Sequence, residues 1–170
     1  MRRFAYGAAL AVLAINCSPG FSYVAPGAVR VKDEQGVGYV VNLSDGVVAR
    51  FQGGAGTNTG AVGIRILNRG EAPLAFAPTP MAVWDAKGKR LETRHCRYTK
   101  LVSPWTRMET SGPEILRKGQ AMEVGCNFPV IFRGGFRTTW APESKRISLA
   151  QPGFSQGGRP LDIRATLVAE

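Results

Sequence analysis

The residues that could act as nucleophiles or metal ligands are few. His95 is the single histidine, and it stands beside Cys96. A cysteine–histidine nucleophile needs the two side chains to meet, but neighbours on a strand point to opposite faces. One histidine and scattered methionines do not form the spaced ligand set that zinc or copper requires. We therefore expect no catalytic pair, no metal site and no cofactor.

Two other features could carry chemistry. The glycine-rich residues 53–60 lack the Lys-Ser/Thr ending and the GxGxxG spacing of phosphate-binding loops. A glycosidase needs two carboxyl groups about 5 to 10 Å apart. Asp33 with Glu34 and Glu109 with Glu114 have the right chemistry, but they lie in stretches typical of solvated surface. The sequence thus predicts a protein that is not an enzyme, with a carboxylate-dependent hydrolase as the weakest alternative.

Positive charge is the most informative chemical feature. The chain carries 22 Lys and Arg against 12 Asp and Glu, a net charge of +10. Two segments interleave cations with aromatic rings, as groups that bind polyanions or stack on rings often do. The candidate binding surface comprises Arg94, Arg97, Lys100, Trp105, Arg107, Phe132, Arg133, Phe136, Arg137 and Trp140. The alternative is that the cations are ordinary surface charge and that the rings beyond residue 130 belong to the core.

The N-terminus has the pattern of an export signal. Arg2 and Arg3 precede an uncharged apolar run over residues 8–15, which is too short to span a bilayer but fits the apolar region of a signal peptide. We predict a signal peptide over residues 1–22, and hence a periplasmic or secreted protein with no membrane span in its mature form. A cut near Ala25 is a variant of this prediction.

Two alternatives to plain secretion stay open. Cys17 could carry a lipid anchor, although Asn16 before it departs from the small residue that lipidation favours. The N-terminal run could also be a buried helix of a cytosolic protein.

Removal of residues 1–22 leaves a basic chain with two cysteines, Cys96 and Cys126. A pair of cysteines in an exported domain most simply forms a disulfide. Such a bridge closes a loop of about thirty residues and stabilises the fold by roughly 3 to 4 kcal/mol.

The apolar pattern along the chain is that of strands. From Val37 onward apolar residues recur at every second position, and no window carries a helical stripe. The clearest hairpin joins residues 39–43 to 47–51, because Asp45-Gly46 between them favours a tight turn. About seven to nine short strands indicate an all-β fold, a two-sheet antiparallel β-sandwich.

The predicted strands and loops indicate where the candidate residues lie. The most regular strand covers residues 121–128 and places Cys126 on the apolar face. Residues 52–60 offer no apolar side chain to bury, and 103–113 hold two prolines and a glycine, so both are interpreted as loops. We expect an N-terminal extension over residues 23–36 and one β-sandwich domain over 37–170.

A resemblance to a known family adds to this interpretation. The run from Val62 to Asp85, with its Asn-Arg-Gly-Glu turn and Trp84 before a Lys-Gly-Lys turn, resembles the immunoglobulin-like sandwiches of secreted bacterial proteins. The sequence Leu-Arg-Lys-Gly-Gln over residues 116–120, which leads into a strand, extends it. The order departs from the family, because Trp84 precedes both cysteines. The resemblance implies an immunoglobulin-like fold that binds or scaffolds.

These observations favour a non-catalytic exported binding protein, an accessory or structural subunit of a cell-envelope or secretion assembly, with an envelope or secreted protein as its partner. Its contact surfaces would be sheet edges and the loops at residues 103–113 and 132–142. The alternative from another class is a basic module that binds a polyanion such as lipopolysaccharide, an anionic glycan or nucleic acid.

Overall fold

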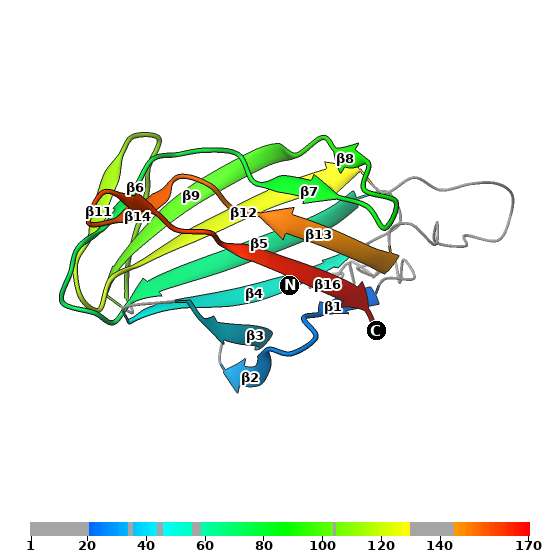
Figure 1. The fold of residues 1–170 in the computed structure, drawn as a ribbon, viewed down its shortest axis with the longest axis horizontal. Helices are drawn as coiled ribbons and strands as arrows, with labels where there is room; N and C mark the ends of the chain where they lie inside the picture. Colours follow the sequence, from blue (N-terminus) through cyan, green and yellow to red (C-terminus); the bar gives the residue numbers. More distant parts are fainter. Residues whose placement is uncertain (1–20, 34–35, 44–45, 56–58, 104, 130–144) are drawn as a thin grey trace, which may run out of the picture.

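The structure, a computed structural model, describes residues 21–33, 36–43, 46–55, 59–103, 105–129 and 145–170. Within these residues the chain forms strands and no α-helix, and each strand pair is antiparallel (Figure 1). The chain is therefore an all-β, two-layer antiparallel sandwich with one disulfide, as the alternating apolar pattern predicted.

The first layer is a broad sheet. Its three central strands are nine or ten residues long, and in two of them, residues 59–68 and 121–129, every second side chain is buried. In spatial order it contains β10 (Thr106–Glu109), β9 (Arg94–Ser103), β12 (Ala121–Pro129), β5 (Thr59–Asn68), β4 (Val47–Ala55), β3 (Gly36–Asn42) and β2 (Val29–Asp33).

The second layer is built from shorter strands. One group is β16 (Arg164–Ala169), β13 (Arg146–Ala150), β7 (Ala82–Trp84) and β8 (Arg90–Leu91). The other group is β11 (Glu114–Leu116), β6 (Leu74–Phe76), β14 (Phe154–Gln156) and β15 (Arg159–Pro160). Both groups contribute to one apolar core with the inner face of the first layer, and the rings of Phe76 and Tyr98 lie 5.5 Å apart across it.

Strand β1 (Phe21–Val24) joins the two layers. Phe21 and Ser22 pair with β4, whereas Tyr23 and Val24 pair with β16. Tyr23 is almost completely buried, and desolvation raises the pKa of its hydroxyl well above the ordinary value. The boundary of the predicted signal peptide after Ser22 therefore falls inside a strand of the sandwich; residues 1–20, including Cys17, lie outside the described residues.

The residues predicted as an N-terminal extension, 23–36, contribute strands to the sandwich. Half of β1 and the whole of β2 lie in this stretch, and β2 pairs with β3 over five residues. The pattern was missed because β2 is an edge strand with mostly exposed side chains, so it shows no apolar alternation.

The predicted hairpin is confirmed, and one predicted loop is corrected. Strands β3 and β4 pair from Tyr39↔Phe51 to Asn42↔Val48, and Gly46 has φ = 79° in the turn. Residues 52–60, by contrast, contain the end of β4 and the start of β5. Their glycines serve packing, because a Cβ on Gly60 would lie 2.2 Å from the Phe128 ring.

The loop predicted for residues 103–113 is also corrected. Thr106–Glu109 form β10, which pairs with β9 as a hairpin. All four side chains of β10 are exposed, so the stretch lacks the apolar signal that marks a half-buried strand.

Candidate functional site

The first feature of the site is a β-bulge in β9. Gly125 of β12 pairs with Arg97 and Asn127 pairs with Arg94, so two residues of β9, His95 and Cys96, face the single residue between them. His95 adopts φ = 50°, a backbone conformation uncommon for residues other than glycine. Bulges of this kind redirect side chains and occur next to functional sites.

The bulge places two arginines on one face. Without it, Arg94 and Arg97 would point to opposite faces, since side chains alternate along a strand. With the additional residue, both lie in cross-strand rows that face away from the core, opposite Asn127 and Gly125. Arg97 and Arg94 therefore belong to the same outer surface, which we call the outer face of the β4–β5–β12–β9 sheet.

The predicted disulfide is confirmed. Cys96 and Cys126 are joined by an S–S bond of 2.11 Å, and Cys126 is 2 % exposed in the core. The bond links neighbouring strands of one sheet, whereas the disulfide of antibody domains joins the two sheets. It fixes β9 to β12 at the bulge, and it is the kind of bond that persists in an oxidising environment.

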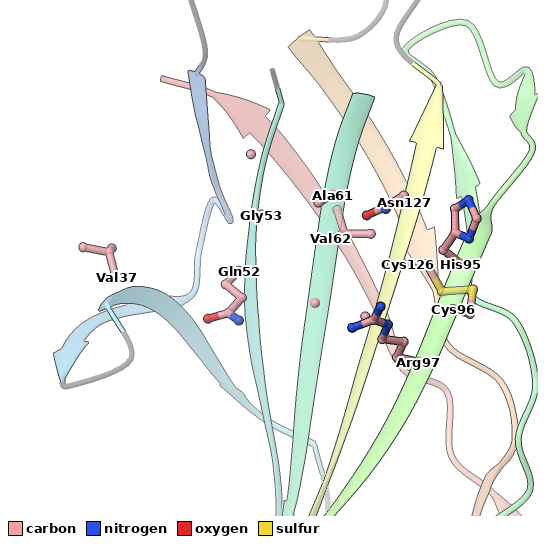
Figure 2. Close-up of a pocket in the computed structure, with 13 residues that line it drawn as sticks. Val37, Gln52, Gly53, Ala61, Val62, His95, Cys96, Arg97, Cys126 and Asn127 are labelled. Atoms are coloured by element: carbon pink, nitrogen blue, oxygen red, sulfur yellow. A yellow bond between two sulfur atoms is a disulfide. The ribbon is translucent and has the colours of Figure 1, made fainter. Parts of the chain in front are cut away.

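A shallow hollow of about 920 Å³ lies on the outer face beside the bulge (Figure 2). Its floor is the backbone of the central strands, which is exposed because Gly63 and Gly125 stand opposite each other there. The residues that line it are Val37, Gln52, Gly53, Gly54, Ala61, Val62, Gly63, His95, Cys96, Arg97, Gly125, Cys126 and Asn127.

Polar side chains surround this glycine floor. Gln52 projects from β4 on one side, and Arg97, His95 and Asn127 stand on the other side (Figure 2). Within the described residues, none of these four side chains forms a hydrogen bond or an ion pair. The hollow thus presents donors, acceptors and one positive charge to whatever enters it.

A smaller hollow of about 190 Å³ continues the first along the outer face. It shares Gln52, Gly63, Arg97 and Gly125 with the first hollow. Arg65 lines it as well, and its Nε donates a hydrogen bond of 2.7 Å to Glu123 on the next strand. The two hollows form a single groove across the strands.

Arg50 holds the wall of this groove in place. Its Nη1 donates to Asp33 at 2.8 Å and its Nη2 donates to the carbonyl oxygen of Gly36 at 2.9 Å. Both partners belong to the β2–β3 hairpin, which also carries Val37 of the larger hollow. The Arg50 side chain lies against Gly38, where a Cβ would be 2.2 Å from its Nε, so this glycine is required by packing.

The other predicted binding residues that the structure describes lie at separate places on the surface. Arg94 pairs with Glu92 at 2.7 Å on the surface. Arg107 is exposed and lies 3.9 Å from Glu123. Trp105 is 89 % exposed at the β9–β10 turn, away from the hollow's lining residues.

Lys100 is not part of the outer face. It pairs with Met122 of β12, whose side chain is in the core, and its Nζ donates a hydrogen bond of 2.8 Å to Glu114 of the second layer. This hydrogen bond, with another from Thr110, holds the pKa of Glu114 below its usual range. Lys100 therefore links the layers, which corrects its assignment to a binding surface.

Phe132, Arg133, Phe136, Arg137 and Trp140 lie outside the described residues.

The features considered for catalysis receive no support from geometry. Glu114 is held by Lys100, whereas Glu109 lies in the outward-facing row of Thr99 and Glu123, so the two carboxylates do not form a facing pair. Asp33 accepts a hydrogen bond from Arg50, and Glu34 lies outside the described residues. The described residues contain no group of three potential metal ligands.

Sequence reasoning found Arg97 but missed its neighbours in the groove. Gln52, Gly63, Gly125 and Asn127 are neither aromatic nor charged, so a search for chemistry-bearing residues passes over them. The available signal was alternation, because Gly63, Gly125 and Asn127 occupy outward positions in the two most regular strands.

Comparisons with known proteins show no family for this chain. No protein-family model matches the chain, and no curated protein matches it. A solved structure similar to it is the yeast GGA1 GAE domain, at 11 % identity, covering 77 % of this chain and 96 % of that one, with a TM-score of 0.30. The strand pairing itself defines this chain as a two-layer antiparallel β-sandwich, and no helix in the part described is long and apolar enough to cross a membrane.

Proposed function

We propose that this chain is a non-catalytic, exported binding protein, an accessory or structural subunit of a cell-envelope or secretion assembly. Its binding site is the groove on the outer face, where it holds an acidic segment of a partner protein. The observation that carries the proposal is a bare glycine floor surrounded by polar side chains with no partner among the described residues.

The fold itself does not require glycine at the floor of the groove. Gly125 has no positive φ, and the nearest heavy atom to a Cβ built there is the Val62 carbonyl oxygen at 4.0 Å. At Gly63 a Cβ would make only ordinary contacts with Gln52, at 3.4 Å. Glycine inside a strand costs about 0.5–1 kcal/mol relative to alanine. Glycine at these two positions lowers the stability of the strands and is not required by packing, so we infer that another chain approaches the backbone closely there.

The chemistry of the rim favours an acidic, extended ligand. Arg97 presents a planar cation with several donors, which matches a carboxylate. Gln52 and Asn127 offer both donors and acceptors on opposite sides of the floor, as the peptide groups of an extended chain require. The groove is open to solvent along its length rather than enclosed, which suits a chain segment better than a small molecule.

The proposal is tested by pull-down of the exported chain from a solubilised envelope of its own source, washed in parallel at low salt and at about 0.5 M salt, where exposed charge attraction is largely screened. We expect a defined protein to survive the high-salt wash with the wild type, because hydrogen bonds and close contacts with the glycine floor are not screened, and to be markedly reduced with Arg97→Ala, which removes hydrogen-bond donors as well as the charge. Arg159→Ala, which removes an exposed arginine of β15, is the matched control and should retain the protein.

A side chain added at the floor of the groove should affect partner binding and stability in opposite directions, so the two effects can be measured separately. Gly125→Val places a β-branched side chain in the groove, where we expect it to block the partner and to raise the free energy of unfolding by up to about 1 kcal/mol, because valine suits a strand better than glycine. The pull-down and urea unfolding measure the two effects. Capture of the same partner by the Gly125→Val protein would contradict the groove as its site.

The polyanion alternative has one observation in its favour, the net charge of +10. Three of the cations, Arg65, Arg94 and Lys100, are however already paired with carboxylates. Release of nucleic acid or anionic glycan by salt alone in the same pull-down, without a defined protein, would favour this alternative over the proposal.

A further inference from the structure

Strand β10 is an open sheet edge at the opposite border of the first layer from β2. Among the described strands it pairs only with β9, so its other side has no hydrogen-bonded neighbour among them. All four of its side chains are exposed, including Met108 at 55 %, and the adjoining Trp105 is the most exposed large apolar residue described. An open edge of this kind is a template for another strand.

The hydrogen-bond pattern defines which backbone groups of β10 are available. The amide of Thr110 donates to the carbonyl oxygen of Tyr98 at 3.0 Å, so Thr110 bonds to β9. Because such bonding alternates along an antiparallel pair, Met108 also bonds to β9. The amide and carbonyl groups of Arg107 and Glu109 therefore point away from β9, toward the open side.

These groups restrict how a second copy of the chain could pair. Two copies of β10 related by a two-fold axis must oppose residues whose backbone groups face outward, which leaves three registers. An axis at Arg107 sets arginine against arginine, and an axis at Glu109 sets glutamate against glutamate. An axis at Met108 sets Arg107 of each copy against Glu109 of the other.

We propose that β10 is a self-complementary edge through which two copies of this chain associate, with the two-fold axis at Met108. Backbone hydrogen bonds join Arg107 to Glu109 of the second copy in both directions. On the outer face the two side chains of each such pair are opposite in charge, and the two Met108 side chains meet on the other face. This association uses a different surface from the groove and does not depend on the proposed function.

Association is measured by sedimentation velocity of the exported chain over a range of concentrations at about 0.15 M salt, where the repulsion expected from the net positive charge is screened beyond about 8 Å. We expect a reversible dimer that grows with concentration. A wild-type chain that stays monomeric up to its solubility limit would overturn the proposal.

A charge exchange tests the register. Arg107→Glu alone and Glu109→Arg alone each create two like-charged pairs at the axis and should weaken the dimer by about tenfold, whereas the double variant Arg107→Glu/Glu109→Arg should restore it. Arg159→Glu makes the same change in net charge as Arg107→Glu at a distant strand and should leave the dimer intact. Circular dichroism confirms that each variant is folded. Failure of the double variant to recover association would contradict this register.

Discussion

Replacing Cys96 and Cys126 together by alanine is expected to lower the free energy of unfolding by about 3 to 4 kcal/mol. The bond joins residues thirty positions apart, so its loss frees a long loop in the unfolded chain. Domains of this size are stable by only about 5 to 15 kcal/mol, so the loss is a large fraction of the total. Urea unfolding followed by circular dichroism measures it.

The same double replacement should also weaken binding of the partner in the groove. The disulfide holds β9 against β12 at the bulge, where Arg97 takes its place above the floor. We expect the double alanine variant to lose its partner in the pull-down even under conditions in which it remains folded. Reduction of the wild-type protein with dithiothreitol should reproduce both effects and serves as a control free of substitutions. Unfolding that is insensitive to both treatments would show that the bond does not constrain the chain as inferred.

The strands of the core could be predicted because their signal is local. Residues 62–67 and 121–128 alternate apolar and polar positions, and both became central strands in which every alternate side chain is buried. Cys126 was placed on the buried face by the same alternation, and it is buried. The Asp-Gly turn likewise needed only its own residues to be recognised.

The missed strands lack such a signal. Residues 29–33 and 106–109 form edge strands whose side chains are mostly or wholly exposed, so no period of two is present. Gly53 and Gly60 lie in a stretch without an apolar side chain to bury, a pattern that is typical of loops. Their real role depends on aromatic rings distant in sequence, Tyr23 beside Gly53 and Phe128 over Gly60, which only the folded chain brings there.

The candidate site was predictable in part for the same reason. Arg97 stood out by its charge, but its orientation depends on the bulge at His95 and Cys96, which results from how β9 pairs with β12 rather than from either strand alone. Lys100 was placed on the wrong surface because its partner, Glu114, approaches from the other layer. Charge can be counted in a sequence, whereas the pairing of charges is a property of the fold.

Asn68 illustrates a buried polar group that only the structure explains. Its side chain is completely buried, and its Nδ2 donates to the carbonyl oxygens of Ala72 at 2.8 Å and Leu116 at 3.0 Å. Its Oδ1 accepts the amide of Gly70 at 3.0 Å. One side chain therefore forms hydrogen bonds with two backbone groups of the turn after β5 and connects this turn to β11 in the second layer.

Asn68→Ala is accordingly expected to lower the free energy of unfolding by about 2 to 4 kcal/mol, because it removes three hydrogen bonds made by a completely buried side chain. Asn68→Asp is the isosteric test of this cause. Its ionised carboxylate accepts from Gly70 but faces two carbonyl oxygens, so the neutral acid is favoured in the folded state and the folded pKa lies above the unfolded one. The aspartate variant should therefore be least stable at neutral pH and gain stability relative to wild type as the pH falls through the folded pKa. Urea unfolding of both variants at several pH values measures this. A pH-independent difference between Asn68→Asp and wild type would show that the hydrogen bonds donated to Ala72 and Leu116 are not what stabilises the fold at this position.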